Sequence, residues 1–139
     1  MYPTCVEKQE RLLQLFAHVK TEEAKYRIIM DLGRSLEPLQ EEERTRANLV
    51  KGCQSRTYLV SRFVGNALFF KAESDALISA GLAALLVQAY SGESPEAILK
   101  CPPSFLETLQ LNTLLTPSRA NGLYSIHLRM RQDALHYLK

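Results

Sequence analysis

The run TYLVSRFVGNALFFKA, residues 57–72, is the most strand-like part of the chain, and it decides the fold class. Two segments rich in aromatic and β-branched residues, Thr57–Val64 and Ala67–Ala72, flank the dipeptide Gly65-Asn66. Glycine in the first position of a two-residue connection is typical of a tight hairpin turn. The run therefore predicts two antiparallel strands.

The turn also predicts which residues pair and which share a face. Phe63 should lie opposite Leu68, and Leu59 opposite Ala72. The predicted core face consists of Leu59, Phe63, Leu68 and Phe70, with Ser61 among them. Antiparallel sheets commonly have one solvated face. The face expected to be wetter carries Tyr58, Arg62 and Lys71.

The segment before the hairpin is polar and contains Pro38. We expect Ser35–Asn48 to be a loop without regular structure that covers or frames Cys53. Ala47–Lys51 is predicted as a short third strand at the sheet edge, which would put Cys53 in the turn between two strands.

Helical patterns surround the hairpin. Helices are predicted over Glu7–Val19, from the N-cap Thr21 to Gly33, from the cap Ser74 to about Tyr90, from Ser94 to Cys101, over about Ser104–Gln110, and from the N-cap Thr116 to the C-terminus. The Ser74–Tyr90 helix is apolar nearly all round and should be buried, and Gly81 inside it indicates a closely packed neighbour. The residues of the last helix predicted to face inward are Leu123, Ile126, Met130, Ala134 and Leu138. The chain is thus expected to be α+β, with about three strands and helices on one face of the sheet, in one domain over residues 1–139.

The composition is ordinary for a globular protein: 139 residues, 46% hydrophobic and 23% charged. A net charge of +2, with basic and acidic residues interleaved, gives no argument for nucleic acid or a membrane as partner. The first residues lack the features of a secretory signal, and the apolar run Ala76–Ala89 is too short to span a bilayer. Three cysteines without a CxxC pair favour a reducing cytoplasm over a disulfide scaffold.

Cys53 is the candidate reactive residue. It follows Gly52 at a predicted turn, between Lys51 and Arg56. Nearby positive charge favours the thiolate, which is the nucleophilic form of cysteine. The alternative is a cysteine that only packs, because free cysteines are often buried. Cys5, in a terminal segment expected to be mobile, and Cys101, before two prolines, are interpreted as structural or incidental.

Other chemistries have weaker support. His18, His127 and His136 are scattered along the chain, so they lack the spacing typical of metal ligands. No phosphate-binding glycine motif is present either. A cysteine hydrolase remains open, because its histidine need not be near in sequence. Arg119, three residues after the predicted N-cap, works against the helix dipole. It either has a functional role or forms a salt bridge to the glutamate-rich loop.

Four blocks give this chain its resemblance to a known family. They are KGCQS (51–55), ESDA with GLAALL (73–76 and 81–86), YSGESP (90–95) and LTPSRANGL (115–123). In this order they resemble the SufE family, the sulfur acceptors that partner cysteine desulfurases in iron–sulfur cluster assembly. Tyr58 stands where the family often has tryptophan, and Ala80 where it often has a basic residue.

The resemblance implies a SufE/IscU-like fold and a function. Cys53 would accept sulfur from the persulfide of a SufS-like, pyridoxal-phosphate-dependent cysteine desulfurase, stimulate that enzyme, and pass the sulfur to an iron–sulfur scaffold. The protein would be an accessory protein without its own cofactor or metal, and its free thiol would be tucked inward until docking. The partner-binding or loop-positioning residues would be Gly52, Gln54, Ser55, Asp75 and Arg119. The alternative is an IscU-like metal or cluster scaffold, although such scaffolds use several cysteines and this chain has only Cys53 at a matching position.

Overall fold

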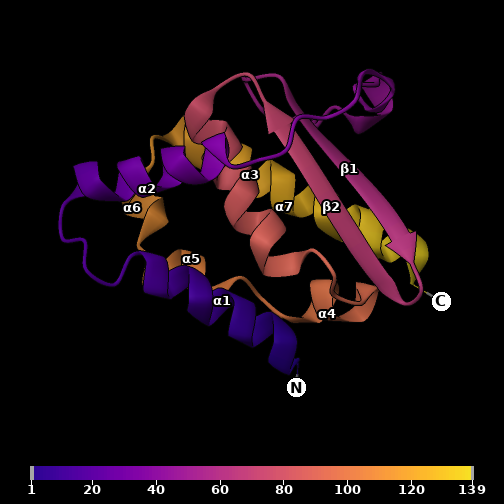
Figure 1. The fold of residues 1–139 in the computed structure, drawn as a ribbon, viewed down its shortest axis with the longest axis horizontal. Helices are drawn as coiled ribbons and strands as arrows, with labels where there is room; N and C mark the ends of the chain where they lie inside the picture. The colour runs from indigo at the N-terminus through magenta and orange to yellow at the C-terminus, as the bar shows by residue number, and fades with distance from the viewer. Residues whose placement is uncertain (1, 139) are drawn as a thin grey trace.

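The computed structural model describes residues 2–138 and confirms the α+β class (Figure 1). Its elements are α1 (Pro3–Leu15), α2 (Glu22–Arg34), two 3-10 turns (Glu41–Glu43 and Arg46–Asn48), β1 (Thr57–Val64), β2 (Ala67–Ser74), α3 (Leu77–Tyr90), α4 (Pro95–Lys100), α5 (Ser104–Thr108), α6 (Leu111–Leu114) and α7 (Pro117–Tyr137). The hairpin lies on one side of α3 and α7, and α1 and α2 lie on the other (Figure 1). No helix within residues 2–138 is both long enough and apolar enough to cross a membrane.

The hairpin has the predicted register. Phe63 pairs with Leu68 and Leu59 with Ala72, and the turn glycine, Gly65, has φ +63°. Of the predicted core face, Leu59, Leu68 and Phe70 are buried, as is Ala72 opposite Leu59. Phe63 is instead 38% exposed and stacks on Tyr137, with ring centroids 4.8 Å apart. Near the turn, β2 therefore contributes Leu68 to the core, whereas Phe63 of β1 packs on the end of α7.

The predicted third strand is wrong: in residues 2–138 the sheet has two strands. A 3-10 turn occupies Arg46–Asn48, because the Thr45 hydroxyl accepts a hydrogen bond from the Asn48 amide and favours a local turn over a ladder. What remains of the strand is a single bridge between Leu49 and Tyr58. The rest of the Ser35–Asn48 segment is irregular, as expected, apart from the turn at Glu41–Glu43.

Helix α3 is the buried centre of the fold, as predicted. Its start differs from the prediction, since Ser74 ends β2 and Ala76 is the N-cap, without a side-chain cap. The Ser74 hydroxyl still accepts a hydrogen bond from the Ala76 amide, at 3.3 Å. The expected close neighbour of Gly81 is α2: a side chain at Gly81 would overlap the carbonyl group of Ile29. Because no other residue fits there, glycine is required for the two helices to touch.

The first helix is shifted relative to the prediction, whereas the last begins after the predicted N-cap Thr116 and ends at Tyr137. Helix α1 spans Pro3–Leu15 rather than Glu7–Val19, because proline suits the first turn of a helix. This places Cys5 in the core with no exposed surface, so the expectation of a mobile terminus at Cys5 is wrong. The predicted inward residues of α7 are buried except Leu138, which follows the helix and is 45% exposed.

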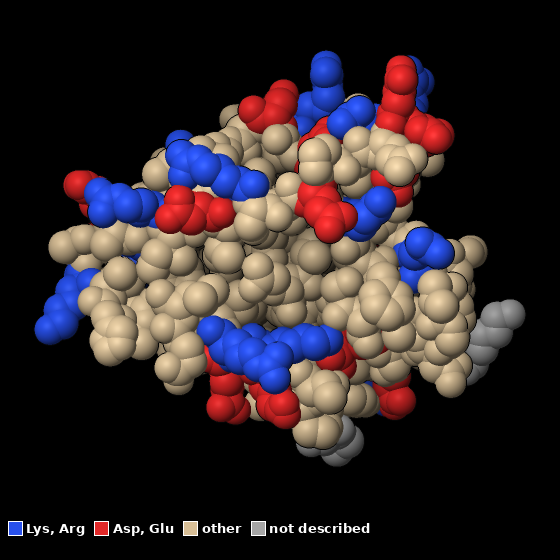
Figure 2. All heavy atoms as spheres, in the orientation of Figure 1, with Lys and Arg blue, Asp and Glu red and all other residues tan. Residues whose placement is uncertain are grey.

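Charged side chains of both signs are intermixed on the surface. On the face in Figure 2, uncharged side chains cover the middle, and basic groups lie beside acidic ones toward the margins. Ion pairs of the described residues include Lys8–Glu93 at 2.6 Å and Arg44–Glu73 at 2.7 Å. Glu93 is 5% exposed, so its pair with Lys8 is the most buried of them. On this face, charge is organised as local pairs rather than as a patch of one sign.

Candidate functional site

The Cys53 loop runs from the Leu49 bridge to the start of β1 and lies against α7. Its first anchor is main-chain: the Val50 amide donates to the Thr57 carbonyl at 2.8 Å. Gly52 has φ +92°, a conformation that residues with side chains rarely adopt. A Cβ there would lie 2.5 Å from the Ser125 hydroxyl oxygen of α7. Gly52 is thus fixed both by backbone conformation and by its contact with the helix.

The Cys53 thiol is half-buried at the first turns of α7. Its Sγ lies 3.7 Å from the carbonyl oxygen of Gly122, and a Cβ on Gly122 would be 3.9 Å from the sulfur. The thiol borders a cavity of about 370 Å³. The other side chains that line this cavity come from the loop, from α3 and from the start of α7, namely Gln54, Ser55, Ala76, Ser79, Thr116, Ser118 and Arg119. The sulfur therefore sits at the edge of a partly enclosed polar hollow.

The environment of Cys53 corrects the expected effect of its neighbours. Burial raises the pKa of the thiol above its ordinary value, and a hydrogen bond with Thr57 opposes that shift. Lys51 and Arg56 are exposed, so water screens their charges. The pKa of Cys53 is therefore raised, opposite to the lowering expected from these cations, because desolvation dominates.

A chain of hydroxyl groups supports the loop from below. The Ser55 hydroxyl donates to Ser79 at 2.9 Å and lies 3.1 Å from the Thr57 hydroxyl, which is 3.0 Å from that of Ser74. Thr57 is 1% exposed. Ser55 was a predicted site residue, whereas Thr57, Ser74 and Ser79 were missed. The signal that could have found Thr57 is a polar residue at the first inward position of a strand next to the cysteine.

Asp75 hydrogen-bonds to Arg56, the last residue of the Cys53 loop before β1. Its carboxylate accepts a hydrogen bond from the Arg56 amide at 2.9 Å, and its own amide donates to the Arg56 carbonyl at 3.1 Å. This pair of bonds ties the residue before β1 to the residue after β2. Of the two roles expected for Asp75, the geometry provides loop positioning directly.

Arg119 lies on the opposite wall of the same cavity. Its guanidinium carbon is 5.7 Å from the centre of the Tyr26 ring, a cation–π contact with α2. Within residues 2–138 it forms no ion pair, so the expected salt bridge to the glutamate-rich loop is absent from the described part. Gln54 is exposed at the rim. All five predicted neighbours of Cys53 thus lie on its loop or border that loop or its cavity.

No histidine of the described chain reaches Cys53. His127 stacks on Tyr90, with ring centroids 5.6 Å apart, and its Nε2 is buried without a hydrogen-bond partner. Burial, with the charge of Arg131 nearby, lowers the pKa of His127 to about 4. Within residues 2–138 no three side chains of the metal-ligating types gather closely enough to hold a metal ion.

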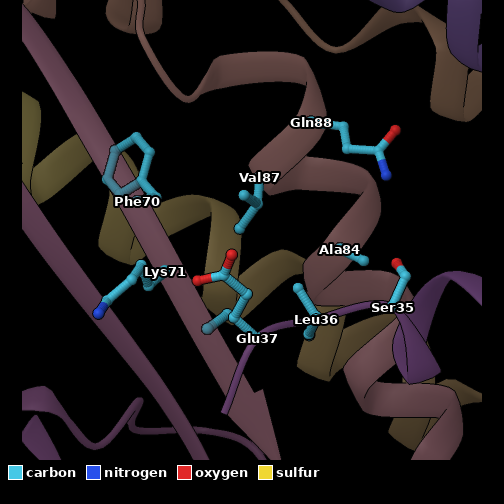
Figure 3. A pocket seen from close by; sticks show the side chains of 9 residues that line it. Ser35, Leu36, Glu37, Phe70, Lys71, Ala84, Val87 and Gln88 are labelled. Carbon is cyan, nitrogen blue, oxygen red and sulfur yellow. The ribbon is translucent and has the colours of Figure 1, made fainter. Parts of the chain in front are cut away.

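Figure 3 shows a second hollow, of about 300 Å³, between β2 and α3. Phe70 and Val87 form its apolar wall, and the Glu37 carboxylate lies between Lys71 and Val87 (Figure 3). Lys71 itself is paired with Glu43 at 2.9 Å. The residues lining this hollow include no thiol or imidazole.

Comparisons with known proteins agree with this geometry. The profile of the SufE family, described as an Fe-S metabolism associated domain, matches residues 10–134. An uncharacterized SufE-like protein of Synechocystis is 34% identical over 127 residues, which cover 91% of this chain and 80% of that protein. SufE-like protein 1 of Arabidopsis thaliana, chloroplastic/mitochondrial, is 38% identical, over 93% of this chain but only 35% of that longer protein.

The fold has a counterpart among solved structures. The solution structure of a hypothetical protein from Thermus thermophilus matches with a TM-score of 0.76 and 24% sequence identity, covering 93% of this chain and 94% of that one. At this identity the match concerns the fold alone. The family profile spans most of the chain, and the relatives exceed 30% identity. The chain therefore belongs to the SufE family.

Proposed function

We propose that this protein is a sulfur acceptor that takes persulfide sulfur from a cysteine desulfurase on Cys53 and passes it to iron–sulfur cluster assembly. The observation that carries the proposal is the position of Cys53. In a SufE-family chain it is a half-buried thiol on a glycine-flanked loop at the edge of a polar cavity. Cys5 and Cys101 are buried in the core and are not candidates for exchange with a partner protein.

The transfer is a thiol–persulfide exchange. The Cys53 thiolate attacks the outer sulfur of the donor persulfide, the sulfur–sulfur bond of the donor breaks, and the donor cysteine leaves as a thiolate. Cys53 then carries the persulfide, and an acceptor thiolate repeats the step at its outer sulfur. No external oxidant or reductant is needed, because the sulfane sulfur moves without net redox change.

Movement of the loop and activation of the thiol are coupled in this proposal. Desolvation raises the pKa of Cys53 at rest, so the tucked thiol is mostly protonated. When the loop leaves the cavity, that cause disappears, and the pKa returns toward its ordinary value. A docked partner would therefore meet a better nucleophile than the solvent does.

The proposed donor is a SufS-like, pyridoxal-phosphate-dependent desulfurase, and the proposed acceptor is an iron–sulfur scaffold. Gly52 permits the loop conformation, Asp75 fixes its exit, and Ser55 supports it from below. Gln54 and Arg119, at the rim and wall of the cavity, are proposed to contact the donor. The protein acts as an accessory to the desulfurase in a reducing cytoplasm, consistent with the three free thiols of the structure.

The test is intact-protein mass after incubation with a cysteine desulfurase and cysteine. The unchanged chain is expected to gain sulfane sulfur that dithiothreitol removes, and Cys53→Ser is expected to gain none while remaining folded. Cys101→Ala is the matched control, since it removes a thiol outside the cavity and should load normally. Loading of Cys53→Ser, or full stimulation of alanine release by that variant, would contradict a covalent relay.

A further inference from the structure

The fold brings together two cysteines that lie far apart in the sequence. Cys5 belongs to the first turns of α1, and Cys101 is the residue that ends α4. The side-chain amide nitrogen of Gln9 lies 3.7 Å from the sulfur of Cys5 and 3.5 Å from the sulfur of Cys101. One small group thus contacts both thiols, and the two thiols also hydrogen-bond with each other, so the two sulfur atoms are neighbours in the core.

The hydrogen bonds that hold Gln9 beside the two thiols do not require the thiols to stay reduced. The same Gln9 nitrogen donates to the Pro102 carbonyl at 3.0 Å, and the side-chain oxygen of Gln9, Oε1, accepts from the Phe105 amide at 3.3 Å. An amide nitrogen has two hydrogens, and here it faces three acceptors, of which the sulfurs are the weak ones. Gln9 can therefore give up a sulfur contact and remain anchored.

A small molecule can approach one of the two sulfurs. Cys101 is 6% exposed and lines a mostly apolar cavity of about 310 Å³ together with Val6, Leu13 and Phe105. That volume is roughly ten times the share of a liquid water molecule, so it admits a molecule the size of hydrogen peroxide. Cys5, with no exposed surface, lies behind it.

We propose that Cys5 and Cys101 form a reversible oxidation site, in which hydrogen peroxide converts the two thiols into a disulfide joining α1 to the turn after α4. The Cys101 thiolate attacks one peroxide oxygen, the O–O bond breaks, and hydroxide leaves, which produces a sulfenic acid. The Cys5 thiolate then attacks the Cys101 sulfur, the S–O bond breaks, and a second hydroxide leaves. The two thiol protons convert both hydroxides into water. Both sulfurs are oxidised, and one peroxide is reduced to two waters.

The environment of the two cysteines determines how fast the disulfide forms, and the position of the disulfide in the chain determines how much it stabilises the protein. Burial, and then hydrogen bonding with Cys101, raises the pKa of the Cys5 thiol, so the reaction is slow at neutral pH and faster in alkaline buffer. The disulfide closes a loop on the order of 100 residues, which restricts the unfolded chain strongly. The oxidised protein is therefore expected to melt several degrees above the reduced protein.

The experiment uses the full chain carrying Cys53→Ser, so that only the proposed pair remains. After peroxide treatment and removal of excess peroxide with catalase, the protein is denatured in the presence of N-ethylmaleimide, and its intact mass is measured. Both thiols are expected to disappear together, leaving a monomer that takes up no maleimide. Proteolysis should release one linked peptide pair containing Cys5 and Cys101, which dithiothreitol separates, and the Tm of the oxidised protein should be higher.

Matched variants separate a disulfide from damage. Cys5→Ala or Cys101→Ala, each added to Cys53→Ser, should show neither the linked peptides nor the rise in Tm. Two thiols that stay free at a peroxide dose that fully oxidises Cys53 in the unchanged chain would overturn the proposal. Sulfinic acids without a link, or a link only between two molecules, would overturn it as well. The Cys53→Ser protein alone decides the matter if an alanine variant fails to fold.

Discussion

The sulfur of Cys53 lies 3.7 Å from the carbonyl oxygen of Gly122, at a position on α7 where no side chain intervenes. The geometry is that of a weak S–H donor facing a helix carbonyl, with glycine providing the space for the thiol. Packing against the core and the contact with the Gly122 carbonyl hold Cys53 in its resting position. The resting state of the loop should therefore respond to the size of residue 122.

The first prediction concerns the size of the side chain at position 122. Gly122→Leu is expected to displace the thiol, because over-packing costs about 1–3 kcal/mol. A shift of this size raises the population of the displaced thiol roughly 5- to 150-fold. The rate of alkylation by iodoacetamide, measured at fixed pH, should rise accordingly.

Gly122→Ala is the matched control for this prediction. Its Cβ would lie 3.9 Å from the sulfur, which is an ordinary contact, so the alkylation rate should change little. Equal alkylation rates in the leucine and alanine variants would contradict the view that Gly122 makes room for Cys53.

The second prediction concerns Thr57, whose hydrogen bond with Cys53 lowers the thiol pKa against the effect of burial. Thr57→Val removes the hydroxyl, so the pKa of Cys53 should rise further. The pH profile of alkylation should move toward alkaline values, while Thr57→Ser, which keeps a hydroxyl, should leave it nearly in place. A profile that stays fixed in Thr57→Val, or moves toward acid, would remove Thr57 from any role in setting the nucleophile.

Local sequence signals predicted what depends on neighbouring residues in the chain. The Gly65-Asn66 turn predicted the strand register, and helical spacing predicted the buried face of α7 up to Ala134. The pKa of Cys53 could not be predicted in this way, because its main cause is burial against Gly122, 69 residues away. Charged neighbours are visible in a sequence, whereas desolvation by a distant helix is not.

The features that the sequence did not predict also depend on contacts between residues far apart in the chain. Thr57 and Ser79 are ordinary polar residues in the sequence, and only the packing of the hairpin on α3, through β2, gathers their hydroxyls at the loop. Cys5 and Cys101 likewise become a pair only when α1 packs beside the end of α4. The predicted third strand is absent because the Thr45 side chain caps a local turn instead. Whether such a turn or a strand forms depends on how the following residues pair.

The third prediction tests the contact between α2 and α3. Gly81→Ala would push a Cβ against the Ile29 carbonyl, which is main chain and cannot rotate away. Alanine gains about 1 kcal/mol of helix propensity, but over-packing against main chain should cost about 3 kcal/mol, the upper end of its usual range, and leave a net loss of about 2 kcal/mol in the free energy of unfolding. Urea titration measures this loss. Gly122→Ala serves again as the comparison, because it carries the same propensity gain without the overlap, and a stabilised Gly81→Ala would mean that the helices can separate at little cost.

The fourth prediction concerns acid and His127. The pKa of His127 is about 4 in the folded protein, against an ordinary value of 6.5 that applies to the unfolded chain. The unfolded state therefore binds a proton that the folded state does not, as pH falls from 6.5 toward 4. The stability associated with neutral His127 is fully present above pH 6.5 and is lost across that window, by about 2 kcal/mol at pH 5. His127→Phe keeps a ring beside Tyr90 and cannot titrate, so its free energy of unfolding should fall less between about pH 7 and pH 5. Carboxylates with lowered pKa values, such as Glu43 and Glu73, contribute equally to both proteins and cancel in the difference. Parallel losses in the two proteins would show that His127 accepts a proton in the folded state without penalty, and that its surroundings open in acid.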